Sequence, residues 1–168
     1  MSAELDAGNL SISCKADTKW GAVAGAARKA GFLVPVQPLS EKDTTAEWLM
    51  EDRPSMGSLK YGTPASAVRS LRLTAGSGAG IVTGYPALSD FASGSNIGAM
   101  LLGTGAEFAR LKSATFKLVP LGELRALHFT VPASGLLPLV EAAVKAVPAL
   151  YHVDFSAAGA EEIGRAHV

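Results

Sequence analysis

A glycine-rich run comes nearest in this sequence to a nucleotide-binding motif: Gly76-Ser77-Gly78-Ala79-Gly80. A dinucleotide fingerprint needs the spacing G-x-G-x-x-G between a strand and a helix, and this run lacks both the spacing and a long helix after it. We therefore interpret it as the turn of a β-hairpin, where glycine supplies positive φ. The chain contains no phosphate-binding G-x-x-x-x-G-K-[ST] motif. The segment from Gly94 to Gly98 is a second, less specific place where a helix N-terminus could hold a phosphate.

Side chains that could act as bases, nucleophiles or metal ligands are scattered along the chain. The histidines form no H-x-H or H-x-x-x-H pair: His128, His152 and His167. Cys14 has no C-x-x-C partner, so we expect a buried, inert thiol, and neither Ser77 nor Ser95 lies in a G-x-S-x-G motif. Three carboxylates share one segment and are interpreted as a solvated acidic face: Glu47, Glu51 and Asp52. The residues alone predict no catalytic group and no metal site.

Length and charge exclude several classes of protein. The chain has 168 residues, of which 48% are hydrophobic and 18% charged, enough for one domain or for one domain with a short appendage. A formal net charge of +0 gives no electrostatic attraction to nucleic acid or to an anionic membrane. The first nine residues do not resemble a signal peptide, and residues 133–151 are interrupted by prolines and charges, so we expect no membrane insertion. The lone Cys14 favours a reducing compartment, hence the cytoplasm, and the low charge suggests a surface covered by a partner subunit or a second copy.

The first half of the chain predicts a strand, then a helix, then a long polar excursion. Residues 10–16 alternate apolar and polar side chains, and an Ala-rich helix follows over 20–30, with an N-cap at Asp17-Thr18 and Gly31 beyond its end. Residues 32–38 contain two prolines and are expected to be extended. In the polar stretch 40–64 we expect a short helix over Thr45 to Met50, with Thr44 as its cap and Glu47 completing a capping box.

The second half alternates strands and helices. We expect strands over 69–74, 80–83, 108–119, 123–131 and 150–155, and helices within 89–102, over 136–147 and over 157–165. The helix within 89–102 would have Ser95 or Asn96 as its N-cap, and Pro138 would lie in the first turn of the helix over 136–147. Because the strands come in antiparallel runs between helices, the fold class is α+β, a mostly antiparallel sheet flanked by helices.

Several segments resemble one family in the same order along the chain. Residues 102–120, LGTGAEFARLKSATFKLVP, resemble the passage G-S-E-G-T-L-G-V-I-T-E-A-T-L-K-L-V-P of FAD-linked oxidases of the vanillyl-alcohol oxidase / p-cresol methylhydroxylase (PCMH) type. That family includes the glycolate oxidase flavin subunit and D-lactate dehydrogenases. Residues 94–103 are similar to its G-Y-D-L-x-x-L-x-x-G, Tyr61-Gly62-Thr63 to its Y-G-T, and residues 9–31 to its opening strand and helix. The likeness covers about residues 8–131.

The resemblance implies that the chain holds the second lobe of a two-lobed FAD-binding domain, over residues 1–131. The first lobe, with its Gly-rich diphosphate loop, and the large substrate cap are both expected to be missing. Residues 132–168 would be a helix–strand–helix appendage and a vestige of the cap. By this likeness the residues near the flavin would be Thr44, Thr45, Gly62, Gly94, Ser95, Gly103 and Thr104.

Departures from the family pattern bear on cofactor binding. Where the family has T-x-G-G, this chain has Thr44-Thr45-Ala46-Glu47. A glutamate facing a diphosphate would repel it, by about 1 kcal/mol at roughly 4 Å in water and by more in a drier cleft. Alanines also replace family glycines at Ala106 and Ala109, although Gly57, Gly62, Gly94, Gly103 and Gly105 remain. The scaffold is kept, and the surface toward the cofactor is altered.

Three hypotheses follow. The first is an FAD-binding lobe or subunit of an FAD-linked oxidoreductase that acts on 2-hydroxy acids such as glycolate or D-lactate, with FAD as cofactor and no catalysis by this chain alone. The second is a non-catalytic structural or assembly subunit, a homo-oligomer or part of a heteromer, that has lost FAD binding. The third is a module that binds another small molecule in the vacated flavin cleft.

Overall fold

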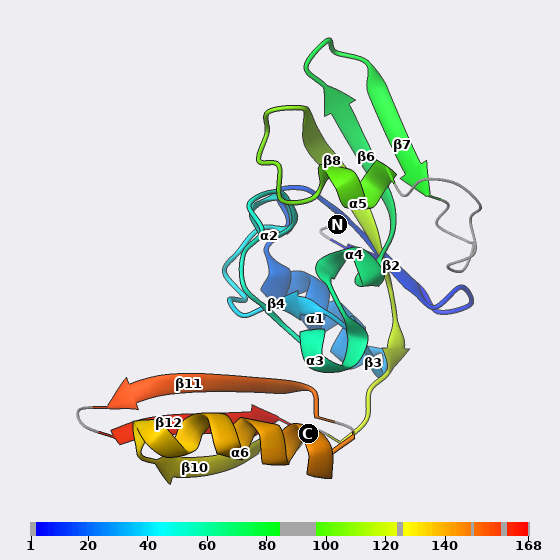
Figure 1. The fold of residues 1–168 in the computed structure, drawn as a ribbon. Coiled ribbons are helices and arrows are strands. Elements are labelled where there is room, and N and C mark those ends of the chain that lie inside the picture. The colour runs from blue at the N-terminus through cyan, green and yellow to red at the C-terminus, as the bar shows by residue number, and fades with distance from the viewer. Residues whose placement is uncertain (1–2, 85–96, 124–125, 149, 159–160, 168) are drawn as a thin grey trace.

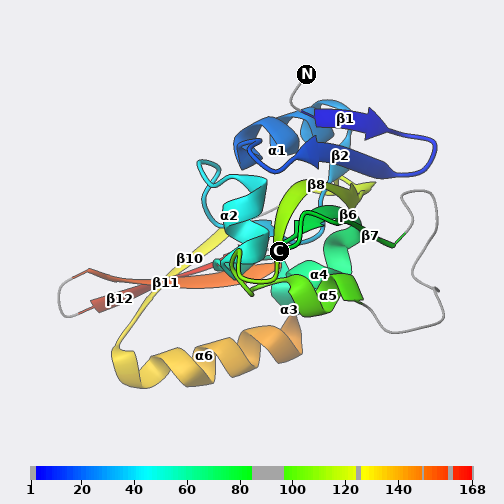
Figure 2. The same cartoon turned by 90° about the horizontal axis from the view of Figure 1, so that it is seen from above.

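A five-stranded antiparallel sheet is the main element of the fold. The protein is described by a computed structural model that covers residues 3–84, 97–123, 126–148, 150–158 and 161–167. The strand order is β1-β2-β8-β6-β7, and every neighbouring pair is antiparallel (Figures 1 and 2). In that order the strands are β1 (Ala3–Asp6), β2 (Ser11–Lys15), β8 (Ala109–Lys117), β6 (Val68–Ala75) and β7 (Gly80–Gly84).

Five helices and two short strand pairs surround this sheet. The helices are α1 (Trp20–Lys29), α2 (Thr45–Met50), α3 (Ser58–Tyr61), α4 (Pro64–Ala67) and α5 (Ile97–Leu101). The pairs are β3 (Phe32–Leu33) with β9 (Val119–Pro120), and β4 (Gln37–Pro38) with β5 (Ser55–Met56). Figure 2 shows α1 beside β1 and β2 at one end of the twisted sheet, and α4 and α5 beside β6 and β7 at the other.

The hydrophobic core lies between one face of the sheet and the helices α1 and α2. Alternate residues of β2, Ile12 and Cys14, point into it, as the two-residue period of a strand requires. Its centre is a cluster of three aromatic rings, with centroids 4.7 Å apart for Trp20 and Trp48, 5.3 Å for Trp20 and Phe116, and 5.7 Å for Trp48 and Phe116. This cluster fixes α2 against the sheet, because Trp48 is fully buried.

The remaining residues form a smaller sheet covered by one helix. Its strands lie in the order β10-β12-β11, with β10 (Ala126–Val131), β11 (His152–Ala158) and β12 (Glu161–His167), and α6 (Ala133–Ala146) packs against β10 and β12 (Figure 1). Tyr151 joins this part to the main lobe. Its hydroxyl accepts a hydrogen bond of 2.9 Å from Gln37 Nε2, and its ring meets that of Tyr61 at 6.2 Å.

The α+β class and the antiparallel sheet are confirmed, as is the capping box of α2. The predicted helix over 157–165 is wrong. That segment contains the end of β11 and most of β12, and β12 pairs with β10 on one side and β11 on the other. The tertiary pairing overrides the helix propensity of alanine and glutamate. The edge strand β1 was not expected at all.

Two helix starts also differ from expectation. α1 begins after Lys19 with no side-chain cap, so the N-cap expected at Asp17-Thr18 is wrong. Its first amides instead donate to backbone carbonyls, Trp20 N to Asp43 O and Gly21 N to Glu41 O. α6 begins at Ala133, so Pro138 lies inside the helix rather than in its first turn.

The expected boundary between residues 131 and 132 stays a prediction, although β10, which ends at Val131, pairs with β12. Within the described residues, no helix is both long and apolar enough to cross a membrane.

Candidate functional site

The start of α2 is the best-defined part of the expected cofactor site. Thr44 is the N-cap, and its Oγ1 accepts a hydrogen bond of 3.2 Å from Glu47 N. In return, the Glu47 carboxylate accepts a hydrogen bond of 2.7 Å from Thr44 N. Thr45 N donates to Thr18 O at 3.0 Å and Ala46 N to Ala16 O at 2.8 Å. The four amides from Thr44 to Glu47 therefore all have partners inside the chain.

Thr45 points into the core and not toward a ligand. It is fully buried, its hydroxyl donates to Thr18 O at 3.2 Å, and the same Oγ1 lies 3.3 Å from Cys14 Sγ. Burial raises the pKa of the Cys14 thiol to about 11, so this sulfur stays protonated at neutral pH. The predicted inert thiol is consistent with this environment. Thr45 can reach a cofactor only if the core opens.

Negative charge gathers around the start of α2. Arg53 is paired with Asp43 at 2.8 Å and with Glu51 at 2.9 Å, and its Nη2 lies 3.9 Å from Glu47. The hydrogen bonds from Thr44 to the Glu47 carboxylate hold the pKa of that carboxyl below its ordinary value, with a smaller contribution from Arg53. Glu47 is therefore charged at neutral pH. One guanidinium faces three carboxylates, and even with Lys19, whose charge also acts on Glu47, the carboxylates outnumber the cations, which disfavours a further anion.

The loop after α5 is held on the other end of α2. Gly103 N donates to Leu49 O at 3.0 Å and Gly105 N to Met50 O at 2.6 Å, so two of the last carbonyls of α2 are satisfied by this loop. Both glycines have positive φ, 73° and 66°, which explains why residues of this type are needed there. The Thr104 hydroxyl donates to Leu101 O at 2.8 Å. Gly103 and Thr104 thus lie at the C-terminal end of α2, whereas Thr44 and Thr45 begin it.

Gly62 belongs to a different part of the lobe. It ends α3 with φ 85°, and its amide donates to Ser58 O at 3.0 Å. A Cβ at this position would lie 2.8 Å from Ser66 Oγ, so the close approach that requires glycine is to α4. No contact described in the structure joins Gly62 to α2. Gly94 and Ser95 lie outside the described residues.

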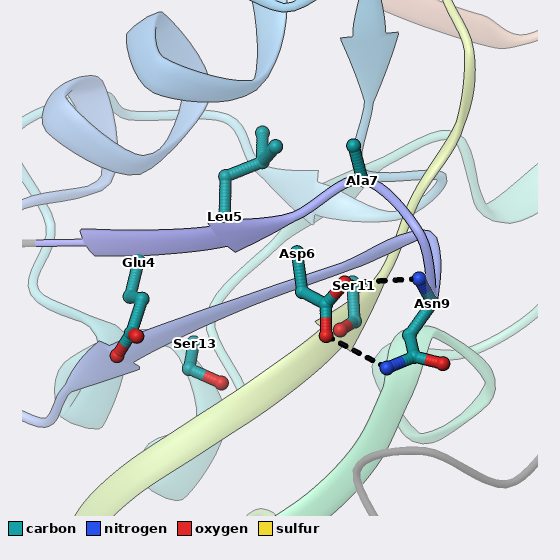
Figure 3. Close-up of a pocket in the computed structure, with 7 residues that line it drawn as sticks. All are labelled: Glu4, Leu5, Asp6, Ala7, Asn9, Ser11 and Ser13. Carbon is teal, nitrogen blue, oxygen red and sulfur yellow. Dashed lines mark hydrogen bonds between the residues drawn. The ribbon is translucent and has the colours of Figure 1, made fainter.

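A shallow hollow of about 550 Å³ lies over the outer face of β1 and β2 (Figure 3). It is lined by Glu4, Leu5, Asp6, Ala7, Asn9, Ser11 and Ser13. Asp6 accepts hydrogen bonds from Asn9 N at 3.0 Å and Asn9 Nδ2 at 2.7 Å, which lowers the pKa of its carboxyl. Among the described residues, none of those expected near a flavin lines this hollow, and its two carboxylates disfavour a phosphate.

Sequence reasoning missed the polar chain that ties the C-terminal part to the lobe. Trp20 Nε1 donates to Gln37 Oε1 at 3.3 Å, and Gln37 Nε2 donates to the Tyr151 hydroxyl. Gln37 and Tyr151 are each 3% exposed. The sequence did hold one signal for this contact, because Gln37 lies between two apolar, proline-containing stretches. A glutamine buried there needs hydrogen-bond partners for its side-chain amide. Gly57 also serves this contact, since a Cβ there would lie 2.6 Å from Tyr151 Cε2.

The residues present do not fit a diphosphate. Binding a diphosphate needs free N–H donors and positive charge. The amides of Thr44, Thr45, Gly62 and Gly103 all donate within the chain, and the charged Glu47 carboxylate accepts the first of these hydrogen bonds. The loop 103–105 can still offer carbonyl and hydroxyl oxygens as acceptors. Such acceptors suit the N–H and hydroxyl groups of a ligand, not its phosphates.

Solved structures with the same fold exist. No protein-family model and no curated protein matches the chain. A variant of Phl p 4 described as a glucose oxidase is similar to it with a TM-score of 0.74 and 16% identity, over 99% of this chain and 34% of that one. Alkyldihydroxyacetonephosphate synthase is similar with a TM-score of 0.76 and 12% identity, over 98% of this chain and 36% of that one. Wild-type Phl p 4.0202, a glucose dehydrogenase, is similar with a TM-score of 0.74 and 16% identity, over 99% of this chain and 34% of that one. The chain thus spans about a third of their length and shares their α+β fold.

Proposed function

We propose that this chain is the second lobe of an FAD-linked oxidoreductase and works with a partner that carries the first lobe. The fold shared over 98–99% of the chain supports this proposal, together with the collinear sequence resemblance to that family. The flavin, when bound, supplies the redox chemistry. The chain itself contributes a rigid surface and no catalytic group. A cytoplasmic location belongs to the same proposal.

The loop 103–105 is the observation that carries the proposal. Its two positive-φ glycines and its bonds to Leu49 and Met50 fix it on α2, which the aromatic cluster holds to the sheet. A loop fixed in this way is preorganised, so a ligand that contacts it loses little conformational entropy on the protein side. Thr104 retains acceptor capacity on its hydroxyl, because it uses its hydrogen toward Leu101. We propose that this loop contacts the flavin.

The substrate class follows from the resemblance alone. Glycolate oxidase and D-lactate dehydrogenase relatives act on 2-hydroxy acids, and we extend that class to the assembled enzyme. The solved structures named above do not narrow it, since their descriptions refer to glucose and to alkyldihydroxyacetone phosphate.

Flavin retention by the assembled complex tests this function. The chain is co-expressed with proteins encoded beside it that carry a Gly-rich first lobe, and the purified complex is examined for flavin absorbance. We expect bound FAD in the complex, and less of it in T104V, which replaces the hydroxyl at the loop. The matched control is T130V, the same change at an exposed position of β10. A colourless complex would refute the proposal.

A second candidate is a structural or assembly subunit that has lost FAD binding. The closed start of α2, where the Glu47 carboxylate accepts the hydrogen bond of Thr44 N, favours this candidate. It predicts a stable homo-oligomer or heteromer that buries more than about 1,000 Å² and contains no flavin. Light scattering of the purified chain, with and without FAD, separates the two candidates.

A further inference from the structure

We infer that the start of α2 is closed to phosphate, because the Glu47 carboxylate already fills the place of an anion there. Any flavin diphosphate of the assembled enzyme is therefore held away from this helix start. The second statement rests on the proposed function. The first rests only on the geometry of this chain.

The amides at this helix start carry the first step. A helix leaves its first N–H groups without intrahelical partners, and those groups are what an anion binds. Here each has a partner: Thr44 N the Glu47 carboxylate, Thr45 N and Ala46 N carbonyls near β2, and Glu47 N the Thr44 hydroxyl. A phosphate could gain a donor only by breaking one of these bonds.

The two carbonyls come from rigid structure, which makes that exchange unfavourable. Thr18 and Ala16 lie between β2 and α1, and the Ala16 amide donates a hydrogen bond to Lys112 O of β8. Thr45 is fully buried beneath them. Of the four partners, only two are side chains that could move aside: the Glu47 carboxylate, whose side chain is 41% exposed, and the Thr44 hydroxyl.

Charge opposes that movement as well. If the Glu47 carboxylate left, Thr44 N would lose its acceptor and the carboxylate would still lie near the incoming anion. Arg53, the nearest guanidinium, is already shared by Asp43 and Glu51 at 2.8 Å and 2.9 Å. A diphosphate at this helix start would therefore need N–H donors and positive charge beyond those that the start of α2 offers.

Nuclear magnetic resonance of the ¹⁵N-labelled chain tests the closed terminus directly. ADP and inorganic pyrophosphate are the probes, and the amides of Thr44 to Glu47 are the readout. We expect neither probe to shift these amides. In E47Q we expect Thr44 N–H to exchange about tenfold faster, because a charged acceptor is replaced by a weaker neutral one. E51Q is the matched control, since among the described residues the Glu51 side chain bonds only Arg53, and we expect it to leave the Thr44 exchange rate unchanged.

The outcomes separate the inference from the proposed function. Shifts of these four amides on adding ADP or pyrophosphate to the unsubstituted chain would overturn the inference, whatever the complex retains. Unshifted amides together with a flavin-free complex leave the closed terminus standing and refute the proposed function. A second variant, E47D, keeps the charge on a shorter side chain. If Thr44 N–H exchanged as slowly in both E47Q and E47D as in the unsubstituted chain, its hydrogen bond to the Glu47 carboxylate would not be what closes this helix start, and the inference would be overturned.

Discussion

Replacing Tyr151 with phenylalanine should destabilise the protein far more than the loss of one oxygen atom suggests. The hydroxyl accepts the Gln37 Nε2 hydrogen bond of 2.9 Å, and both side chains are 3% exposed. In Y151F the ring remains, but a buried amide donor loses its acceptor, which costs about 1–3 kcal/mol. For a chain of this length each kcal/mol lowers Tm by about 2–4 °C, so we expect a decrease of about 2–12 °C.

Differential scanning calorimetry and urea unfolding measure this effect. Y61F is the matched control, because the Tyr61 hydroxyl has no hydrogen bond among the described residues and its ring lies beside that of Tyr151. A double-mutant cycle that combines Y151F with Gln37→Met isolates the interaction between Gln37 and Tyr151. The hydrogen bond from Trp20 to Gln37 is lost in both the single and the double variant that carry Gln37→Met, so its loss cancels in the coupling energy. An unchanged Tm in Y151F, or a cycle with no coupling energy, would refute the view that this bond ties the C-terminal part to the lobe.

Three further predictions follow from local geometry. T44A removes the acceptor of Glu47 N and should cost about 1 kcal/mol in urea unfolding, while T44S restores most of it. G57A should prevent docking of Tyr151, because at φ 88° the new Cβ would meet Pro35 O and the Tyr151 ring; limited proteolysis after residue 121 would reveal the loosened C-terminal part. Glu47 has a lowered pKa, so its stabilising effect is present above the ordinary pKa of 4.5 and is lost as the pH falls through the lowered pKa. In acid, the Tm of E47Q should therefore depend less on pH than the Tm of the unsubstituted chain. The other charged groups around the site stay unchanged in this variant: Arg53, Lys19, Asp43 and Glu51.

Sequence patterns predicted most of the lobe because its elements carry strong local signals. Alternation over residues 10–16 and the glycines between β6 and β7 predicted a strand and a hairpin that the structure contains. The capping box of α2 was also correct, since both of its partners lie within four residues. The start of α1 and the strand β12 were not predictable in this way. The first amides of α1 are satisfied by Asp43 and Glu41, and β12 lies between β11, its neighbour in sequence, and the more distant β10.

The candidate site was predicted only in part, for a similar reason. The resemblance predicts that Gly103, Thr104 and Thr44 lie near a flavin, which stays a prediction. The structure shows that Gly103 and Thr104 belong to a fixed loop, and the capping-box pattern predicted the helix start at Thr44. The resemblance gave no indication that Thr45 faces the core or that Gly62 serves a contact with α4. A motif gives residue types in order, whereas the direction of a side chain depends on what packs around it.

The aromatic cluster has a practical consequence for spectroscopy. The chain has two tryptophans, and Trp20 and Trp48 lie 4.7 Å apart at the same point in the lobe. Tryptophan emission therefore reports the lobe, together with the docking of Tyr151 that reaches Trp20 through Gln37, whereas no tryptophan lies within the small sheet at the C-terminal end. Where emission and far-ultraviolet dichroism change at different urea concentrations, the gap between the two curves measures how independently the two parts melt.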